Sequence, residues 1–205
     1  MFYHLYSNTS NTLIIKNSRF ITHVYRVLSV VEAKQILVKL KKDEYYDATH
    51  ITYGYHINNE IRSSDDGEVP GTAGRQILKV LEAKEIVDCL AVVIRYYGGI
   101  QLGIPGLTKA YTRSISEALK DQALILMDKG LRLNIWIPYI KLDLFIRHFQ
   151  ARYQLISKQI DDEGASLLID CLADLKSEIL NFSEHIKINE ELSVLIEQHN
   201  PSKPD

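Results

Sequence analysis

The hydrophobic positions in the first half of the chain follow two different periods. Residues 20–27 and 50–57 alternate between apolar and polar side chains, which predicts half-buried strands. The uniformly apolar residues 89–94 predict a strand that is covered on both faces. Residues 33–40 and 107–119 instead repeat their apolar side chains every three or four positions, which predicts helices. An α+β fold is therefore expected for this half.

The second half repeats the mixture in a recognisable order. Residues 131–137 alternate and predict a strand, and the polar residues 128–130 are expected to separate it from the preceding helical region. A helix after Pro138, a hairpin over residues 155–171, a helix capped by Asp174 and a strand at 192–196 follow. The order β-α-β-β-α-β predicts a ferredoxin-like domain. We therefore expect domains at residues 1–127 and 131–198, and a flexible tail at 199–205.

Composition limits the class of protein without naming a partner. The 46% hydrophobic and 24% charged residues are typical of a soluble globular protein, and a net charge of −2 does not by itself indicate a nucleic-acid binder. We find neither a signal peptide nor an apolar run long enough to span a membrane. The two cysteines, Cys89 and Cys171, lie in apolar runs of different predicted domains, which favours buried free thiols and a cytoplasmic protein.

A glycine-rich loop between the apolar strand and the helix at 107–119 is the strongest candidate site. Its predicted ligand-binding residues are Arg95, Gly98, Gly99, Gly103, Gly106, Lys109 and Arg113. Exposed backbone N–H groups at a helix start favour an anion, and residues 89–116 include no acidic side chain to oppose one. The alternative is that the glycines only allow tight turns and close packing. The loop lacks the Walker signature, so nucleotide hydrolysis has no support.

The acidic loop at residues 63–74 allows two interpretations. Asp65, Asp66 and Glu68 could hold a divalent cation, because clustered carboxylates suit magnesium or calcium. We favour the alternative, in which these carboxylates pair with Arg75 or Arg95 and lock the two loops together.

Two further side chains have possible functions. His50 could act as an acid or base, although a lone strand histidine is more often structural. Trp136 lies opposite the apolar face of its strand and could stack on a base or a partner. Cover by a helix of its own domain is the expected alternative for Trp136.

These loops also resemble a known family. The motifs are SDDGE followed by GTAGR, then RYYGGIQLG, then GLTKAY, with upstream matches in SRFI and DATH. Together they resemble the amino-terminal domain of the IMPACT family over about residues 1–127, and the remainder resembles the small carboxy-terminal domain of bacterial members. One departure is Pro105, which stands where family members usually have a glycine and which removes one N–H donor.

The resemblance implies a domain like domain 2 of ribosomal protein S5, followed by a ferredoxin-like domain, as in the last domains of elongation factor G. It implies a non-catalytic, translation-associated regulator that binds structured RNA or a ribosome-bound partner through the glycine-rich basic loop. It implies no cofactor, no membrane and no recognition of a DNA sequence. The alternatives are an enzyme acting on a small phosphorylated substrate, with Asp65, Asp66 or His50 as metal ligand or base, and a pure protein–protein interaction module.

Overall fold

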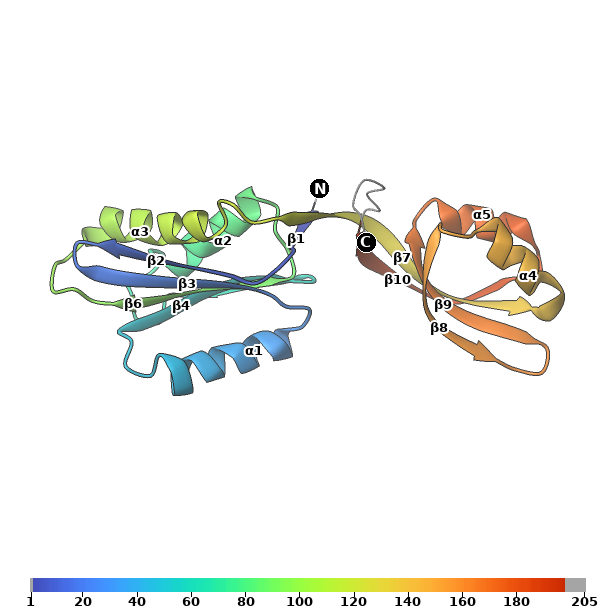
Figure 1. Cartoon of the computed structure of the whole chain (residues 1–205), viewed down its shortest axis with the longest axis horizontal. Helices are drawn as coiled ribbons and strands as arrows, with labels where there is room; N and C mark the ends of the chain where they lie inside the picture. Colours follow the sequence, from blue (N-terminus) through green and yellow to red (C-terminus); the bar gives the residue numbers. More distant parts are fainter. Residues whose placement is uncertain (1, 198–205) are drawn as a thin grey trace. The chain divides into compact units, whose positions relative to one another are not determined.

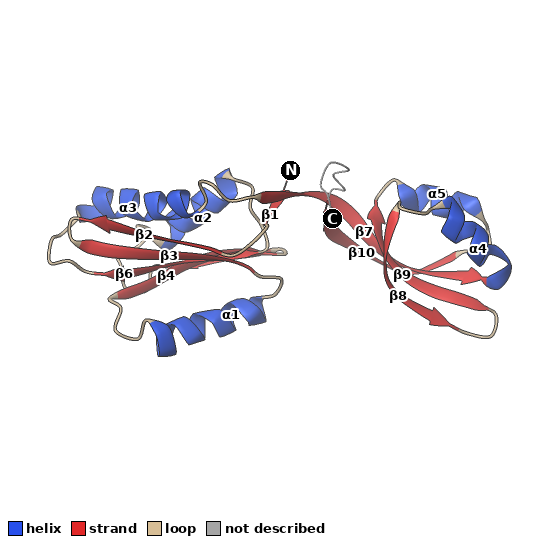
Figure 2. Ribbon diagram, viewed as in Figure 1, coloured by secondary structure: helices blue, strands red, loops and turns tan. Residues whose placement is uncertain are grey.

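The computed structural model describes residues 2–197 and falls into two compact units that divide between Leu126 and Met127. The predicted tail at residues 199–205 lies outside the described residues. Both units are mixtures of helices and antiparallel sheet, so the α+β class is confirmed (Figure 2).

The first unit is built on a sheet of strand order β2-β3-β6-β4-β5, in which every neighbouring pair is antiparallel. Helices α2 and α3 cover one face of this sheet and α1 covers the other (Figure 1). The elements are β1 (Phe2–Leu5), β2 (Thr9–Ile15), β3 (Ser18–Arg26), α1 (Val30–Lys39), η1 (Leu40–Glu44), β4 (His50–Ile57), β5 (Glu60–Ser64), α2 (Gly74–Ala83), β6 (Cys89–Tyr96) and α3 (Gly103–Ala118).

Strand β6 explains why its sequence is apolar throughout. Ala91 and Val93 pack in the core beneath α2 and α3, while Val92 and Ile94 pack in the core beneath α1. The next residue on the α2/α3 side is Arg95, so the strand delivers a charged side chain to the end of a fully apolar row. The expectation of a strand covered on both faces is confirmed.

Helix α1 begins at a capping arrangement close to the predicted one. The Ser29 hydroxyl accepts a hydrogen bond from the Glu32 N–H, and the Glu32 carboxylate accepts one from the Leu28 N–H. The first bond satisfies an amide that the first helical turn leaves without a partner, and the second ties the residue before the N-cap to the helix. A π-helical segment, η1, continues from α1 and brings Lys41 toward the acidic loop.

The second unit has the predicted element order β-α-β-β-α-β. Its strands lie in the order β10-β7-β9-β8, and all neighbouring pairs are antiparallel. The apolar faces of α4 and α5 pack on one face of this sheet. The elements are β7 (Leu124–Pro138), α4 (Tyr139–His148), β8 (Tyr153–Ile160), β9 (Gly164–Leu172), α5 (Leu175–Phe182) and β10 (Lys187–Glu197).

Some elements differ from the expectation. Residues 128–130 do not form a linker, because β7 begins at Leu124 and their backbones pair with β10. Backbone pairing does not depend on side-chain polarity, so the polar residues gave no sign of it. Strands β1 and β2 were not predicted, and Asp174 precedes α5 without a side-chain capping bond. No helix within residues 2–197 is long and apolar enough to cross a membrane.

Candidate functional site

Arg95 lies at the centre of the predicted site, but it is buried. Its side chain comes from the end of β6 and is 6% exposed. Nη1 donates to Glu68 Oε1 at 2.5 Å, and Nη2 donates to the Ser18 hydroxyl at 3.3 Å. Arg95 therefore pairs with the acidic loop, as one of the two expected pairings had it, and Glu68 balances its charge in the interior.

Glu68 also accepts a hydrogen bond from the hydroxyl of Tyr111, at 2.7 Å. Burial and the adjacent carboxylate raise the pKa of Tyr111, so the phenol stays protonated and remains a donor. The acidic loop, β6 and α3 are thus tied together through one carboxylate.

The other two carboxylates of the acidic loop also face protein donors. Asp65 accepts from the N–H groups of Ala73 and Gly74, where α2 begins, and from that of Gly71. Asp66 accepts from Lys41 Nζ at 2.5 Å and from the Ile51 N–H at 2.7 Å. Burial raises the pKa of Asp66, but these two hydrogen bonds outweigh it and hold the pKa below its ordinary value.

This arrangement favours loop locking over cation binding. Within residues 2–197 no group of three His, Cys, Asp or Glu side chains is placed to hold a metal ion. Of the two arginines expected to pair with the loop, Arg95 does so through Glu68, while Arg75 is exposed and has no ion-pair partner in the described part of the chain. The ion pair between Lys41 and Asp66 was not predicted from the sequence, because no local pattern indicates a contact between residues 25 positions apart.

His50 is held in one orientation by the acidic loop. Its Nδ1 lies 2.8 Å from the backbone carbonyl oxygen of Asp66, and a carbonyl can only accept, so Nδ1 carries a proton. The second ring nitrogen, Nε2, lies 3.8 Å from Glu68 Oε1. Nε2 is therefore the nitrogen left for other partners.

The glycines divide into packing positions and conformational positions. A Cβ on Gly98 would lie 2.1 Å from the backbone carbon of Asn17, and the Gly98 N–H already donates to the Ser18 hydroxyl at 3.1 Å. Gly98 therefore serves packing, which corrects its expected role as a ligand donor. Gly99 and Gly103 have φ values of +80° and +69°, which side chains rarely adopt. A Cβ on Gly106 would meet Leu102 Cβ at 3.0 Å.

Helix α3 begins without the usual protection of its amides. Leu102 at the N-cap makes no side-chain capping bond, and the first turn includes no acidic residue. Lys109 and Arg113 lie four positions apart on the same helix and are exposed. After the neutralisation of Arg95, these two side chains supply the exposed positive charge of the predicted loop.

A cleft of about 520 Å³ opens beside this helix start in the first unit. It brings together three predicted site residues, His50, Arg95 and Gly103, while Lys109 and Arg113 do not line it. The lining residues are Thr49, His50, Val69, Arg95, Tyr97, Gln101, Leu102, Gly103, Ile104 and Leu107.

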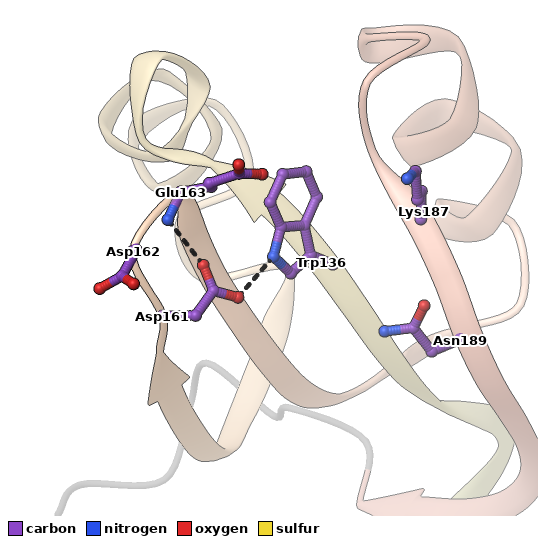
Figure 3. Close-up of a pocket in the computed structure, with 6 residues that line it drawn as sticks. All are labelled: Trp136, Asp161, Asp162, Glu163, Lys187 and Asn189. Atoms are coloured by element: carbon purple, nitrogen blue, oxygen red, sulfur yellow. Dashed lines mark hydrogen bonds between the residues drawn. The ribbon is translucent and has the colours of Figure 1, made fainter.

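A second hollow, of about 540 Å³, lies in the second unit around Trp136 (Figure 3). The indole N–H donates to Asp161 Oδ2 at 2.8 Å, and Lys187 Nζ lies 5.7 Å from the ring centroid. Asp162 and Glu163 add two carboxylates. Trp136 is half-buried on the face opposite the helices, so the expectation that a helix covers it is wrong.

Comparisons with known proteins match the first unit and the motifs. The Impact N-terminal domain matches residues 16–119. IMPACT family member YvyE of Bacillus subtilis is 46% identical over 110 residues, which cover 52% of this chain and 50% of that protein. IMPACT family member YigZ of Escherichia coli is 40% identical over 111 residues, covering 52% and 54%. The chain spans about half the length of the curated relatives it matches.

A solved structure extends the likeness to both units. The crystal structure of a hypothetical protein superposes with a TM-score of 0.67 at 27% identity, covering 91% of this chain and 95% of that one. Because the domain match includes more than half of the residues and contains both motif loops, the chain belongs to the IMPACT family.

Proposed function

We propose that this chain is a non-catalytic, translation-associated regulator that binds the phosphates of structured RNA through the glycine-rich basic loop and the exposed cations of α3. Family membership supports the link to translation, which in turn implies a cytoplasmic location. The free, buried state of both cysteines agrees with a reducing compartment.

The proposal includes a finer fold assignment. The first unit is assigned to the class of ribosomal protein S5 domain 2, and the second to the ferredoxin-like class, as in the last domains of elongation factor G. The strand order β10-β7-β9-β8 with two helices on one face supports the second assignment.

The observation that carries the RNA proposal is the exposure of Lys109 and Arg113, four positions apart on α3, in a helix whose first turn is uncapped and includes no acidic residue. The dipole and the free amides at the helix start favour a bound phosphate. The two exposed cations, further along the same helix, can contact neighbouring phosphates of the RNA backbone. Contacts of this kind position an RNA without reading its sequence.

The test is to remove both side chains and to measure binding of a structured RNA hairpin at several salt concentrations. We expect Lys109→Ala with Arg113→Ala to weaken binding to all hairpin sequences alike and to reduce the slope of log K against log salt by roughly one to two. The matched control is Lys34→Ala with Lys42→Ala, which removes the same charge from α1 and η1 on the other side of the sheet.

Two results would contradict the proposal: an unchanged salt slope in the Lys109/Arg113 variant, or an equal loss in the control. If the parent chain binds no hairpin but still cosediments with ribosomes after nuclease treatment, the partner is a ribosomal protein and the RNA proposal is wrong.

A further inference from the structure

We propose that the cleft of the first unit binds a phosphate monoester with an apolar or aromatic body. The proposal shares the first amides of α3 with the proposed RNA binding and goes beyond it, because it adds His50 and Arg95 in place of Lys109 and Arg113.

Arg95 supplies the first indication of an anion. It is nine-tenths buried, it lines the cleft, and its Nε has no hydrogen-bond partner among the described residues. A buried donor without a partner is rare in folded proteins, and it points to an acceptor that comes from outside the chain. The carboxylate that could repel such an acceptor, Glu68, does not line the cleft; its Oε1 accepts from Arg95 and Tyr111 and lies 3.8 Å from His50 Nε2.

The helix start supplies the second indication, from a different element. Gly103 and Ile104 line the cleft, and their amides belong to an uncapped helix of 16 residues. The dipole of such a helix favours negative charge at this end. Pro105 lacks an N–H, so the amides of Gly103, Ile104 and Gly106 are the donors that the first turn offers.

His50 completes the polar end of the cleft. The bond from Nδ1–H to the Asp66 carbonyl fixes the ring and makes Nε2 of the neutral ring an acceptor, which can take a hydrogen bond from a protonated phosphate oxygen. Thr49 also lines the cleft, and its Oγ1 accepts from the Tyr97 N–H, so its hydroxyl hydrogen is available to donate.

The remaining walls indicate what the phosphate is attached to. Val69, Tyr97 and Ile104 line the cleft and are 42%, 47% and 59% exposed, which makes an apolar rim around the polar end. A volume of about 520 Å³ lies in the range of small-molecule sites. An inorganic anion would leave this rim uncovered, whereas a monoester with an aromatic body would cover it.

The experiment titrates the full chain with phenyl phosphate, inorganic phosphate and phenol by calorimetry. We expect phenyl phosphate to bind saturably and more tightly than either fragment, by about tenfold or more, because it joins both halves of the site. A 5′-phosphorylated oligoribonucleotide and its 5′-hydroxyl counterpart decide whether the monoester comes from a small molecule or from an RNA end. A preference for the phosphorylated strand over phenyl phosphate assigns the RNA end.

Two variants test the residues. Ile104→Glu places a carboxylate at the exposed helix start and should weaken phenyl phosphate binding by about tenfold, while Ile100→Glu, also exposed but outside the cleft lining, should change it less than about twofold. His50→Gln should weaken binding by several-fold and leave the melting temperature within a few degrees. The Lys109/Arg113 double variant should bind phenyl phosphate as the parent does, which separates this proposal from the RNA proposal.

The proposal is overturned if phenyl phosphate gives no saturable binding, or if Ile104→Glu and Ile100→Glu bind it equally well.

Discussion

The two hollows of this molecule have nearly equal volumes, about 520 and 540 Å³, but they differ in the charge of their walls. The hollow in the first unit is lined by an uncapped helix start, by His50 and by Arg95, whose charge Glu68 balances, with no carboxylate in its wall. The hollow in the second unit is lined by three carboxylates, with one lysine and one tryptophan.

The difference arises from where each acidic cluster directs its oxygens. In the first unit the carboxylates of the acidic loop turn inward and accept from Arg95, Tyr111, Lys41 and backbone amides. In the second unit residues 161–163 lie in an exposed turn, where the described residues donate to the Asp161 carboxylate alone, from the indole and two backbone amides. An acidic stretch of sequence can therefore either supply buried carboxylates that hold loops together or form a solvent-exposed acidic surface. Burial of the carboxylates decides between the two.

The largest expected effect on stability comes from Glu68, the buried carboxylate of the acidic loop. Glu68→Gln removes the charge that balances Arg95 in the interior, and we expect a loss of about 3–5 kcal/mol in the free energy of unfolding. The exposed counterpart, Asp161→Asn, should cost far less, because water can replace its partners. Urea unfolding followed by circular dichroism measures both.

The sole tryptophan separates the two units in the same experiment. Trp136 lies in the second unit, so its fluorescence reports unfolding there, and Glu68→Gln should shift the circular dichroism transition while leaving the fluorescence transition in place. Equal stability losses in Glu68→Gln and Asp161→Asn would contradict the distinction between a buried structural carboxylate and an exposed one.

A smaller effect is expected from Asp66, and it depends on pH. Burial raises the pKa of Asp66, but hydrogen bonds from Lys41 and the Ile51 N–H bring it below the ordinary value. A carboxyl whose pKa is lower in the folded state stabilises the fold at neutral pH, and this contribution is lost as the pH falls through the folded pKa.

We therefore expect Asp66→Asn to be less stable than the parent by about 1–2 kcal/mol at pH 7, and the difference to close below about pH 4. The control is Asp43→Asn, on the exposed surface of η1, which should change stability by less than about 0.5 kcal/mol at either pH. A difference between Asp66→Asn and the parent that stays constant from about pH 5 to the lowest pH at which both remain folded would show that the charge is not its source.

The spacing of hydrophobic residues predicted most of the strands and helices that carry these sites. Strand β4 has the expected bounds, and β6 extends the expected run by two residues to Arg95 and Tyr96, because polar end residues carry no apolar signal. Strand β2 escaped prediction, since its threonine and asparagine residues give little apolar contrast and its place is fixed by pairing with β3. The local pattern is informative where one face is buried and weak at a polar edge.

The sequence indicated which loops form the candidate site better than it indicated what each of their side chains does. The glycine-rich loop and the acidic loop meet in space, but the sequence could not show that Arg95 is directed inward while Lys109 remains outside. That choice depends on Glu68 and Tyr111 arriving from 27 positions upstream and 16 downstream. The same holds for Gly98, whose contact with the Asn17 backbone is created by the sheet and not by its neighbours in the chain.

The smallest expected effect tests the charge of the second hollow directly. Trp136 is half-buried beside Asp161, with Asp162 and Glu163 close by, so cations should be concentrated around the indole and anions depleted. Asp162→Asn with Glu163→Gln should therefore raise the quenching of Trp136 fluorescence by iodide and lower the quenching by caesium, each by up to about twofold at low ionic strength. Asp161 is retained so that the indole hydrogen bond is unchanged. The matched control is Asp143→Asn on α4, whose helix packs on the other face of the sheet, and it should alter neither quenching constant. The two quenchers should move in opposite directions, because a change in solvent access alone would move both in the same direction. A parallel change would therefore contradict an acidic surface at Trp136, and with it the electrostatic contrast between the two hollows.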